Sequence, residues 1–176
     1  MMRCRLASLL LLAPLMATGV ALLDTGPAAA EDTGVCSLVT REEAGELLGA
    51  KVVKTTTKTS KTNGAEECTY RTKKAQKELK DRSLKISLEL TVQPLTDDLH
   101  SKLQSIPFDD GSRVAGIGDE AYVTKFDQVI AISGRNAVAA KLQNYRGASS
   151  KFRNVSEGAV KAALPRLGRL TPPTSS

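Results

Sequence analysis

The sequence is poor in the residue types that most catalytic and metal sites use. Its 176 residues include one histidine, no tryptophan and three cysteines, and aromatic residues make up only 3% of the chain. The chain also has no Gly-x-Ser-x-Gly motif of the kind that presents a serine nucleophile. We therefore expect a protein that is not an enzyme and that holds no metal and no cofactor.

Long uncharged hydrophobic runs are absent except at the N-terminus. Arg3 and Arg5 precede an uncharged apolar stretch, 6–23, and a run of alanines ends at Ala30. This pattern predicts a signal peptide, residues 1–30, cleaved near Ala30. The product would be a secreted or periplasmic protein without a transmembrane span. The alternative is an uncleaved anchor, although the apolar stretch is near the lower length limit for crossing a ~30 Å hydrocarbon core.

The rest of the chain alternates between helix and strand patterns. Thr40 and Glu43 form a capping box at the start of a helix that Gly49 ends. The segment 84–92 alternates apolar and polar residues, which is typical of a strand with one buried face. Further strands are predicted at 51–59, 67–71, 121–125, 129–133 and 137–145, with helices starting at Thr96 and at Asn154 or Ser156.

This order suggests a duplicated αβββ unit. We predict a single α+β domain over residues 31–170, in which two to three helices pack on one face of a mostly antiparallel sheet. The polar strand 51–59 is expected at a sheet edge. Pro165 is expected to kink or end the last helix, and residues 171–176 to form a disordered tail.

Export makes the cysteine count informative. Cys4 lies within the predicted signal peptide, so Cys36 and Cys68 would remain in an oxidising compartment. One disulfide is the simplest outcome there. The alternatives are two buried free thiols or a metal-binding pair, but two cysteines and a lone histidine do not complete a zinc site.

Three short segments occur together in the chain. They are Cys36-Ser37-Leu38-Val39-Thr40 before a helix, Cys68-Thr69-Tyr70 in a strand and Gly116-Ile117-Gly118-Asp119-Glu120-Ala121 in a turn. In this order they resemble segments of small secreted proteins and lipoproteins of unknown function from actinobacterial cell envelopes. The resemblance covers about residues 35 to 165, and it implies an envelope-facing α+β domain with a Cys36–Cys68 bridge. Members are often lipoproteins, and this chain departs from them by lacking a lipidation cysteine. The resemblance implies no catalytic residue.

Basic residues are concentrated in two neighbouring segments. If both lie at one end of the sheet, they form a positive patch suited to anionic envelope polymers or lipid headgroups. The alternative is a solvated edge that lysines protect from aggregation. The candidate patch comprises Lys51, Lys54, Lys58, Lys61, Lys73, Lys74, Lys77, Lys80 and Arg82.

Other features favour structural interpretations. Gly116, Gly118 and Asp119 lack the Lys-Ser/Thr of a phosphate loop and precede a strand, so we expect a turn. His100 has no base or nucleophile partner at local spacing. Calcium is a minor alternative, because the acidic pairs lack EF-hand spacing. These pairs are Asp97-Asp98, Asp109-Asp110 and Asp119-Glu120.

We predict a non-enzymatic domain that binds at the cell envelope, with an envelope protein or an anionic envelope component as its partner. One alternative is an electrostatic binder of anionic polymers or lipids. Another is a hydrolase that uses His100 with an acidic residue. Nucleic acid is not expected as a partner, because no aromatic residues interleave the lysines.

Overall fold

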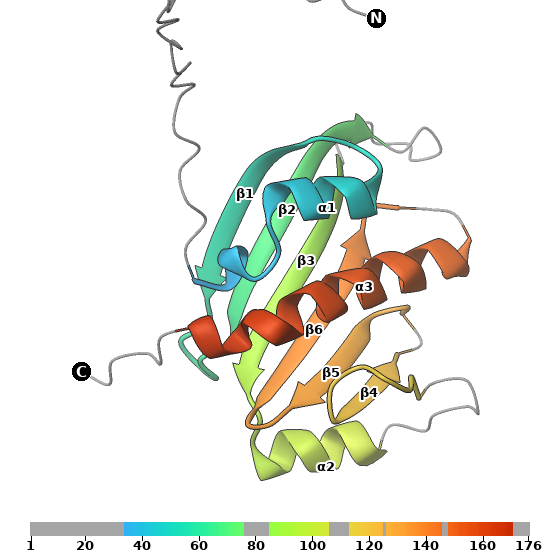
Figure 1. The fold of residues 1–176 in the computed structure, drawn as a ribbon. Helices are drawn as coiled ribbons and strands as arrows, with labels where there is room; N and C mark the ends of the chain where they lie inside the picture. Colours follow the sequence, from blue (N-terminus) through green and yellow to red (C-terminus); the bar gives the residue numbers. More distant parts are fainter. Residues whose placement is uncertain (1–33, 76–84, 106–112, 125, 146–147, 171–176) are drawn as a thin grey trace, which may run out of the picture. The chain divides into compact units, whose positions relative to one another are not determined.

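The computed structural model describes residues 34–75, 85–105, 113–124, 126–145 and 148–170 (Figure 1). The predicted signal peptide and the predicted tail 171–176 lie outside these residues. The elements are the 3-10 helix η1 (Gly34–Ser37), α1 (Arg41–Leu48), β1 (Val52–Thr59), β2 (Glu66–Ala75), β3 (Lys85–Pro94), α2 (Asp97–Ser105), β4 (Glu120–Val123), β5 (Val129–Ser133), β6 (Asn136–Gln143), α3 (Ser149–Ala163) and the 3-10 helix η2 (Leu164–Arg169). One six-stranded antiparallel sheet with three α-helices confirms the predicted α+β class.

The strand order reflects the order of elements in the sequence. The sheet runs β1-β2-β3-β6-β5-β4, and each neighbouring pair is antiparallel. Each set of three consecutive strands is thus a meander, and the two meanders join where β3 pairs with β6 (Figure 1). The sequence suggests a duplicated αβββ unit but does not predict a strand order, and the two meanders are compatible with such a unit. The polar strand β1 lies at an edge, as expected.

The larger core lies between one face of the sheet and the elements η1, α1 and α3. Cys68, Leu90 and Ala140 form one cross-strand row on this face, and each is 0% exposed. A Cβ atom added at Gly158 of α3 would lie 2.4 Å from Leu47 Cδ2 of α1. Glycine at this position therefore allows α3 to pack closely against α1.

The helix α2 lies on the opposite face, which corrects the expectation that the helices share one face. In β4, Ala121 and Val123 pack in the larger core. Tyr122, between them, packs instead with Ile132 and Leu103 of α2 in a second cluster. Because successive side chains of a strand point to opposite faces, α2 covers the other face at β4 and β5. The duplicated strand order therefore does not extend to the placement of the helices.

The ends of α1 follow the signals in its sequence. Thr40 Oγ1 accepts a hydrogen bond from the Glu43 amide at 3.2 Å, and the Glu43 carboxylate accepts one from the Thr40 amide at 2.8 Å. Gly49 ends the helix in the left-handed conformation, with φ 63°. In α2, Thr96 Oγ1 accepts from the Leu99 amide at 3.2 Å. Both caps are those that the sequence predicts.

The start of α3 differs from the prediction. The helix begins at Ser149 rather than at Asn154 or Ser156, and its N-cap residue makes no side-chain hydrogen bond. The first turn packs instead through Phe152, whose ring meets Tyr145 edge-on with centroids 5.1 Å apart. The start of α3 therefore coincides with the contact between Phe152 and Tyr145 and not with a side-chain cap.

The end of α3 follows its proline. The α-helix stops at Ala163, and η2 continues with Pro165 in its first turn. Proline cannot donate the backbone hydrogen bond that an α-helix needs at that position. The change to η2 leads directly to Arg166.

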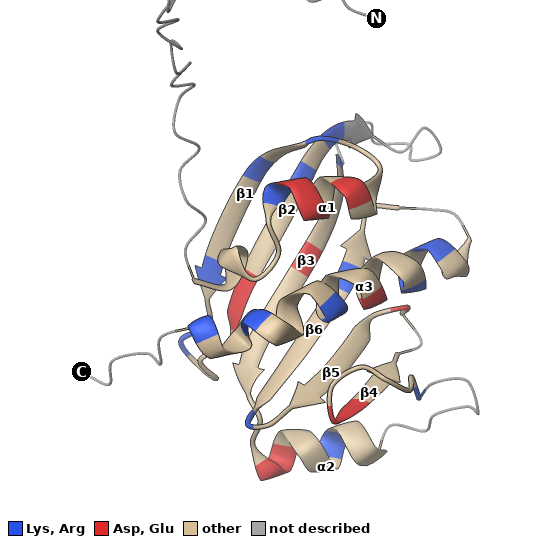
Figure 2. Cartoon of the chain, in the orientation of Figure 1, with Lys and Arg blue, Asp and Glu red and all other residues tan. Residues whose placement is uncertain are grey.

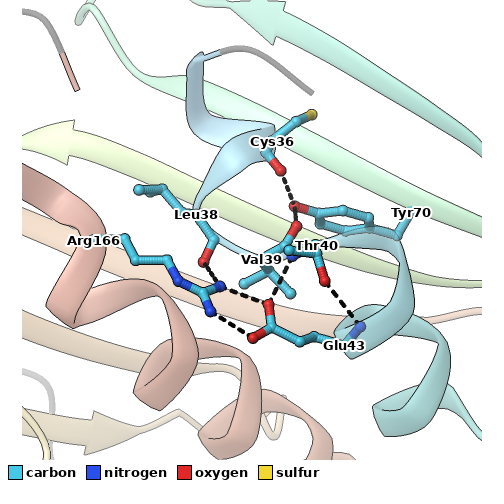
Figure 3. Close-up of polar contacts among 7 residues, drawn as sticks. All are labelled: Cys36, Leu38, Val39, Thr40, Glu43, Tyr70 and Arg166. Atoms are coloured by element: carbon cyan, nitrogen blue, oxygen red, sulfur yellow. Dashed lines mark hydrogen bonds and ion pairs between the residues drawn. The ribbon is translucent and has the colours of Figure 1, made fainter. Parts of the chain in front are cut away.

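Arg166 joins the C-terminal part of the domain to the start of α1 (Figure 3). Its Nη1 and Nη2 atoms donate to the two carboxylate oxygens of Glu43, both at 2.6 Å. Nη1 also donates to the Leu38 carbonyl at 3.0 Å. Nearby, the fully buried Tyr70 donates its hydroxyl to the Val39 carbonyl at 2.7 Å. These bonds fix the segment between η1 and α1 against β2 and η2.

Candidate functional site

The two cysteines predicted to remain after export are bonded to each other. The structure joins Cys36 to Cys68 in a disulfide, with Cα atoms 5.2 Å apart. Both residues are buried, and the Thr57 hydroxyl lies 3.1 Å from Cys36 Sγ. Because Cys36 lies in η1 and Cys68 lies in β2, the bridge ties η1 to the sheet. Neither cysteine is left as a thiol for catalysis or metal binding.

The structure divides the candidate basic patch between two ends of the sheet. The N-terminal part of β1 pairs with the C-terminal part of β2. Lys51, Lys54 and Lys73 therefore lie at one end of these strands, whereas Lys58 and Lys61 lie at the opposite end. Residues 73–75, which follow the strand predicted at 67–71, also belong to β2. The remaining patch members, Lys77, Lys80 and Arg82, lie outside the described residues, as does the side chain of Lys74.

Two further cations, which the patch predicted from the sequence does not include, complete the first group. Arg71 lies directly opposite Lys54 in the β1–β2 register. Lys85 begins β3 and pairs with Ala75 at the same end. We call this group the basic end, and its members are Lys51, Lys54, Arg71, Lys73 and Lys85, all exposed. The alternation of apolar and polar residues indicates that Arg71 and Lys85 face solvent. Only the strand register shows that they lie at the same end of the sheet as Lys54.

The electrostatics of the basic end differ from those of the rest of the same sheet face. Farther along this face, Glu67 lies 3.9 Å from Lys58 Nζ, and Glu89 lies 2.7 Å from Lys141 Nζ. Among the residues that the structure describes, no carboxylate forms an ion pair with Lys51, Lys54, Arg71 or Lys73. Figure 2 shows basic segments toward the upper ends of β1 and β2. The positive charges of these four residues are therefore not neutralised by a described carboxylate.

The juxtaposition of Lys54 and Arg71 has an energetic cost. Like charges placed directly opposite each other on antiparallel strands are destabilising, on the order of a few tenths of a kcal/mol. The next residue across the sheet is Ser87, which pairs with Arg71 and is buried. No neighbouring acid in this row relieves the repulsion, since Gln143 follows Ser87. Lys54 and Arg71 are the exposed members of this row, because Ser87 is buried and Gln143 donates its side-chain amide to Glu89.

The glycine-containing turn before β4 has a structural arrangement. Gly116 and Gly118 have φ values of 76° and 61°. The Asp119 amide donates to the Ile132 carbonyl at 2.8 Å, and Asp119 Oδ2 accepts from the Gly134 amide at 2.7 Å. The turn thus fastens the start of β4 to the β5–β6 hairpin, and the Asp119 carboxylate bonds to backbone.

The structure brings His100 to an acidic residue that is distant in sequence. His100 Nε2 lies 3.5 Å from Glu120 Oε1 and 3.2 Å from Gln104 Nε2. The Tyr122 hydroxyl donates to the other Glu120 oxygen. This hydrogen bond is the main cause that lowers the pKa of Glu120 and raises the pKa of Tyr122. A shallow cavity of about 310 Å³ lies beside Glu120, lined by residues 113–115 and 119–122.

A hydrolase of the predicted alternative type requires more than this contact. If the nucleophile is a serine, threonine or cysteine, the base must come within hydrogen-bond reach of it. Over residues 34–75, 85–105, 113–124, 126–145 and 148–170, no hydroxyl or thiol hydrogen-bonds to the His100 ring. The contact joins α2 to β4.

The acidic pairs fall in three separate places. Asp97 and Asp98 occupy the first turn of α2, where Asp98 also lies 2.6 Å from Lys102 Nζ. Asp109-Asp110 lies outside the described residues, and Asp119-Glu120 makes the contacts given above. Within the described ranges, no three His, Cys, Asp or Glu side chains form a group that could hold a metal ion.

Comparison with protein-family models, with curated proteins and with solved structures finds no match to the chain. In the part of the chain that the structure describes, no helix is both long enough and apolar enough to span a membrane.

Proposed function

We propose that the chain is an exported, non-enzymatic domain that binds an anionic component of the cell envelope through the basic end. The observation that carries this proposal is the pair Lys54 and Arg71, directly opposite each other without an ion pair to a described carboxylate. A bound anion would relieve their repulsion, so the arrangement favours a ligand with negative charge.

Two features support export. The N-terminal residues have the composition of a signal peptide. The Cys36–Cys68 disulfide is of a kind that persists in oxidising compartments and is rare in the cytosol. The resemblance to actinobacterial envelope proteins also favours a location at the cell envelope.

Protection of an edge strand accounts for only part of the basic end. Lysines on β1 fit that role, because β1 is an edge. Arg71 and Lys85 lie on β2 and β3, which have neighbours on both sides. Cations on these interior strands do not shield an unpaired edge. Ligand binding explains both the edge and the interior cations.

The proposal is tested by retention of the purified protein on an immobilised polyphosphate resin over a series of salt concentrations. The double variant Lys54→Gln/Arg71→Gln should bind about tenfold more weakly and show a shallower salt dependence, because two cations are removed. The matched control is Lys58→Gln/Lys61→Gln, which removes the same charge from the other end of β1. Equal losses in the two variants, or retention that does not change with salt, would contradict the proposal.

A further inference from the structure

We propose that the anionic component is the surface of an anionic lipid bilayer, on which the basic end docks together with the exposed side chains of Val53 and Phe126. This inference rests on the proposed function and names its ligand. Val53 is 45% exposed and Phe126 is 76% exposed, and no other large hydrophobic side chain of the described residues is as open to solvent.

Val53 lies among the cations because of an irregularity in β1. The register pairs Val52 with Thr72 and then Lys54 with Arg71, so Val53 is the extra residue of a bulge. A bulge leaves its additional residue unpaired and redirects the side chain. Val52 is accordingly buried, at 7% exposed, while Val53 next to it is open to solvent.

Phe126 extends toward the same end from the other half of the sheet. It lies in the turn between β4 and β5, which closes with a hydrogen bond from the Thr124 amide to the Gln128 carbonyl at 2.9 Å. Val129, directly after the turn, pairs with Ala140 of β6, and β6 runs from there toward Gln143. Since Gln143 belongs to the row of Lys54 and Arg71, the register places the turn at the same end of the sheet as the basic end, with β3 and β6 lying between β2 and β5.

The turn that carries Phe126 is held in place. Asp127 has φ 55° and its amide donates to the Thr124 carbonyl at 2.9 Å. The Ser156 hydroxyl of α3 donates to the Asp127 carbonyl at 3.3 Å. The aromatic ring is therefore presented to solvent by a turn with defined contacts, which lowers the entropy lost when it enters a ligand surface.

The combination of cations and apolar side chains at one end selects a lipid surface over a soluble polymer. Anionic bilayers attract each nearby Lys or Arg by roughly a fivefold gain in binding. Aromatic and aliphatic side chains add to this attraction by entering the boundary between headgroups and acyl chains. A soluble polyanion would engage Lys54 and Arg71 but would not require Phe126 to be exposed.

The test uses the full protein and vesicles of phosphatidylcholine with or without phosphatidylglycerol. Co-sedimentation should require phosphatidylglycerol. Phe126→Ser should weaken vesicle binding about tenfold but leave retention on polyphosphate unchanged, because the ring would enter the bilayer but would not bind a soluble polyanion. Unchanged thermal unfolding of the variant would show that the exposed substitution leaves the fold intact.

A second readout exploits the absence of tryptophan from the chain. Phe126→Trp introduces a single indole, whose fluorescence should shift to shorter wavelength with anionic vesicles but not with polyphosphate. If polyphosphate binds but anionic vesicles do not, or if Phe126→Ser binds vesicles as the wild type does, the lipid inference is wrong and the proposed function stands. If neither ligand binds, both are wrong.

Discussion

Glu43 serves two structural elements with one carboxylate. It is the third helical residue of the capping box at Thr40, and it receives both terminal nitrogens of Arg166 (Figure 3). The hydrogen bonds from Arg166 lower the pKa of Glu43 from 4.5 to about 2, against an opposing effect of desolvation. Because the side chain is 33% exposed, solvent screens the pair, and its contribution is about 1 kcal/mol.

Glu43→Gln should therefore lower the free energy of unfolding by about 1–2 kcal/mol at neutral pH. A carboxyl group with a lowered pKa stabilises the fold above its unfolded pKa, and that contribution is lost as the pH falls through the folded pKa. The difference between wild type and variant should thus shrink as the pH falls from 4.5 toward about 2. Urea unfolding at a series of pH values measures this difference. Glu46 is an exposed carboxylate of the same helix, so Glu46→Gln is the control. An equal decrease in the free energy of unfolding in Glu46→Gln would contradict a specific contribution from Glu43.

In the turn before β4, the backbone at Gly118 lies close to the backbone of Ile132 in β5. A Cβ atom at Gly118 would lie 2.3 Å from the Ile132 carbonyl oxygen, which is a backbone atom that cannot move aside cheaply. The same carbonyl accepts the Asp119 amide, so displacing it would weaken the attachment of β4 to β5. Gly116 has a similar positive φ, but a Cβ atom added there would have no neighbouring atom within 4 Å.

The two glycines provide a matched comparison. Gly118→Ala should lower the free energy of unfolding by about 3 kcal/mol, through both left-handed backbone strain and the clash. Gly116→Ala should cost about 1 kcal/mol, because only the backbone strain applies. Chemical denaturation of both variants gives the two values. Similar losses would mean that the close approach at Gly118 is unimportant.

Helix ends show how far local signals extend. The ends of α1 were predictable because Thr40, Glu43 and Gly49 act through bonds within a few residues of each other. The start of α3 was not, because Phe152 packs on Tyr145 at the end of the preceding strand region. A capping rule detects only the first kind of contact.

For the whole molecule, the disulfide joins the N-terminal segment to the sheet. The cysteines are separated by 32 positions, and Cys68 lies in the row of the sheet that contains Leu90 and Ala140. A bridge over such a loop stabilises the fold mainly by restricting the unfolded chain. The domain therefore depends on oxidation for part of its stability.

Replacing both cysteines by serine should lower the free energy of unfolding by roughly 3–4 kcal/mol in the chain-entropy description. Urea unfolding of the wild type with added reductant should approach the curve of the double variant. The double variant itself should not respond to reductant, which serves as the control. A wild-type curve that does not change when the thiols are shown to be reduced would contradict this role for the bridge.

The sequence by itself determined the α+β class, the polar edge strand and the capped helix ends, because these follow from periodicity and from contacts a few residues apart. It also indicated the cysteine pair from their number and proposed compartment. Only the tertiary structure decided that α2 lies on the opposite face, because the alternation in β4 does not say which face each helix covers. The register likewise separated Lys58 from Lys54 and placed Arg71 opposite Lys54. A charged surface depends on which strands are neighbours, and that information arises only when the sheet forms.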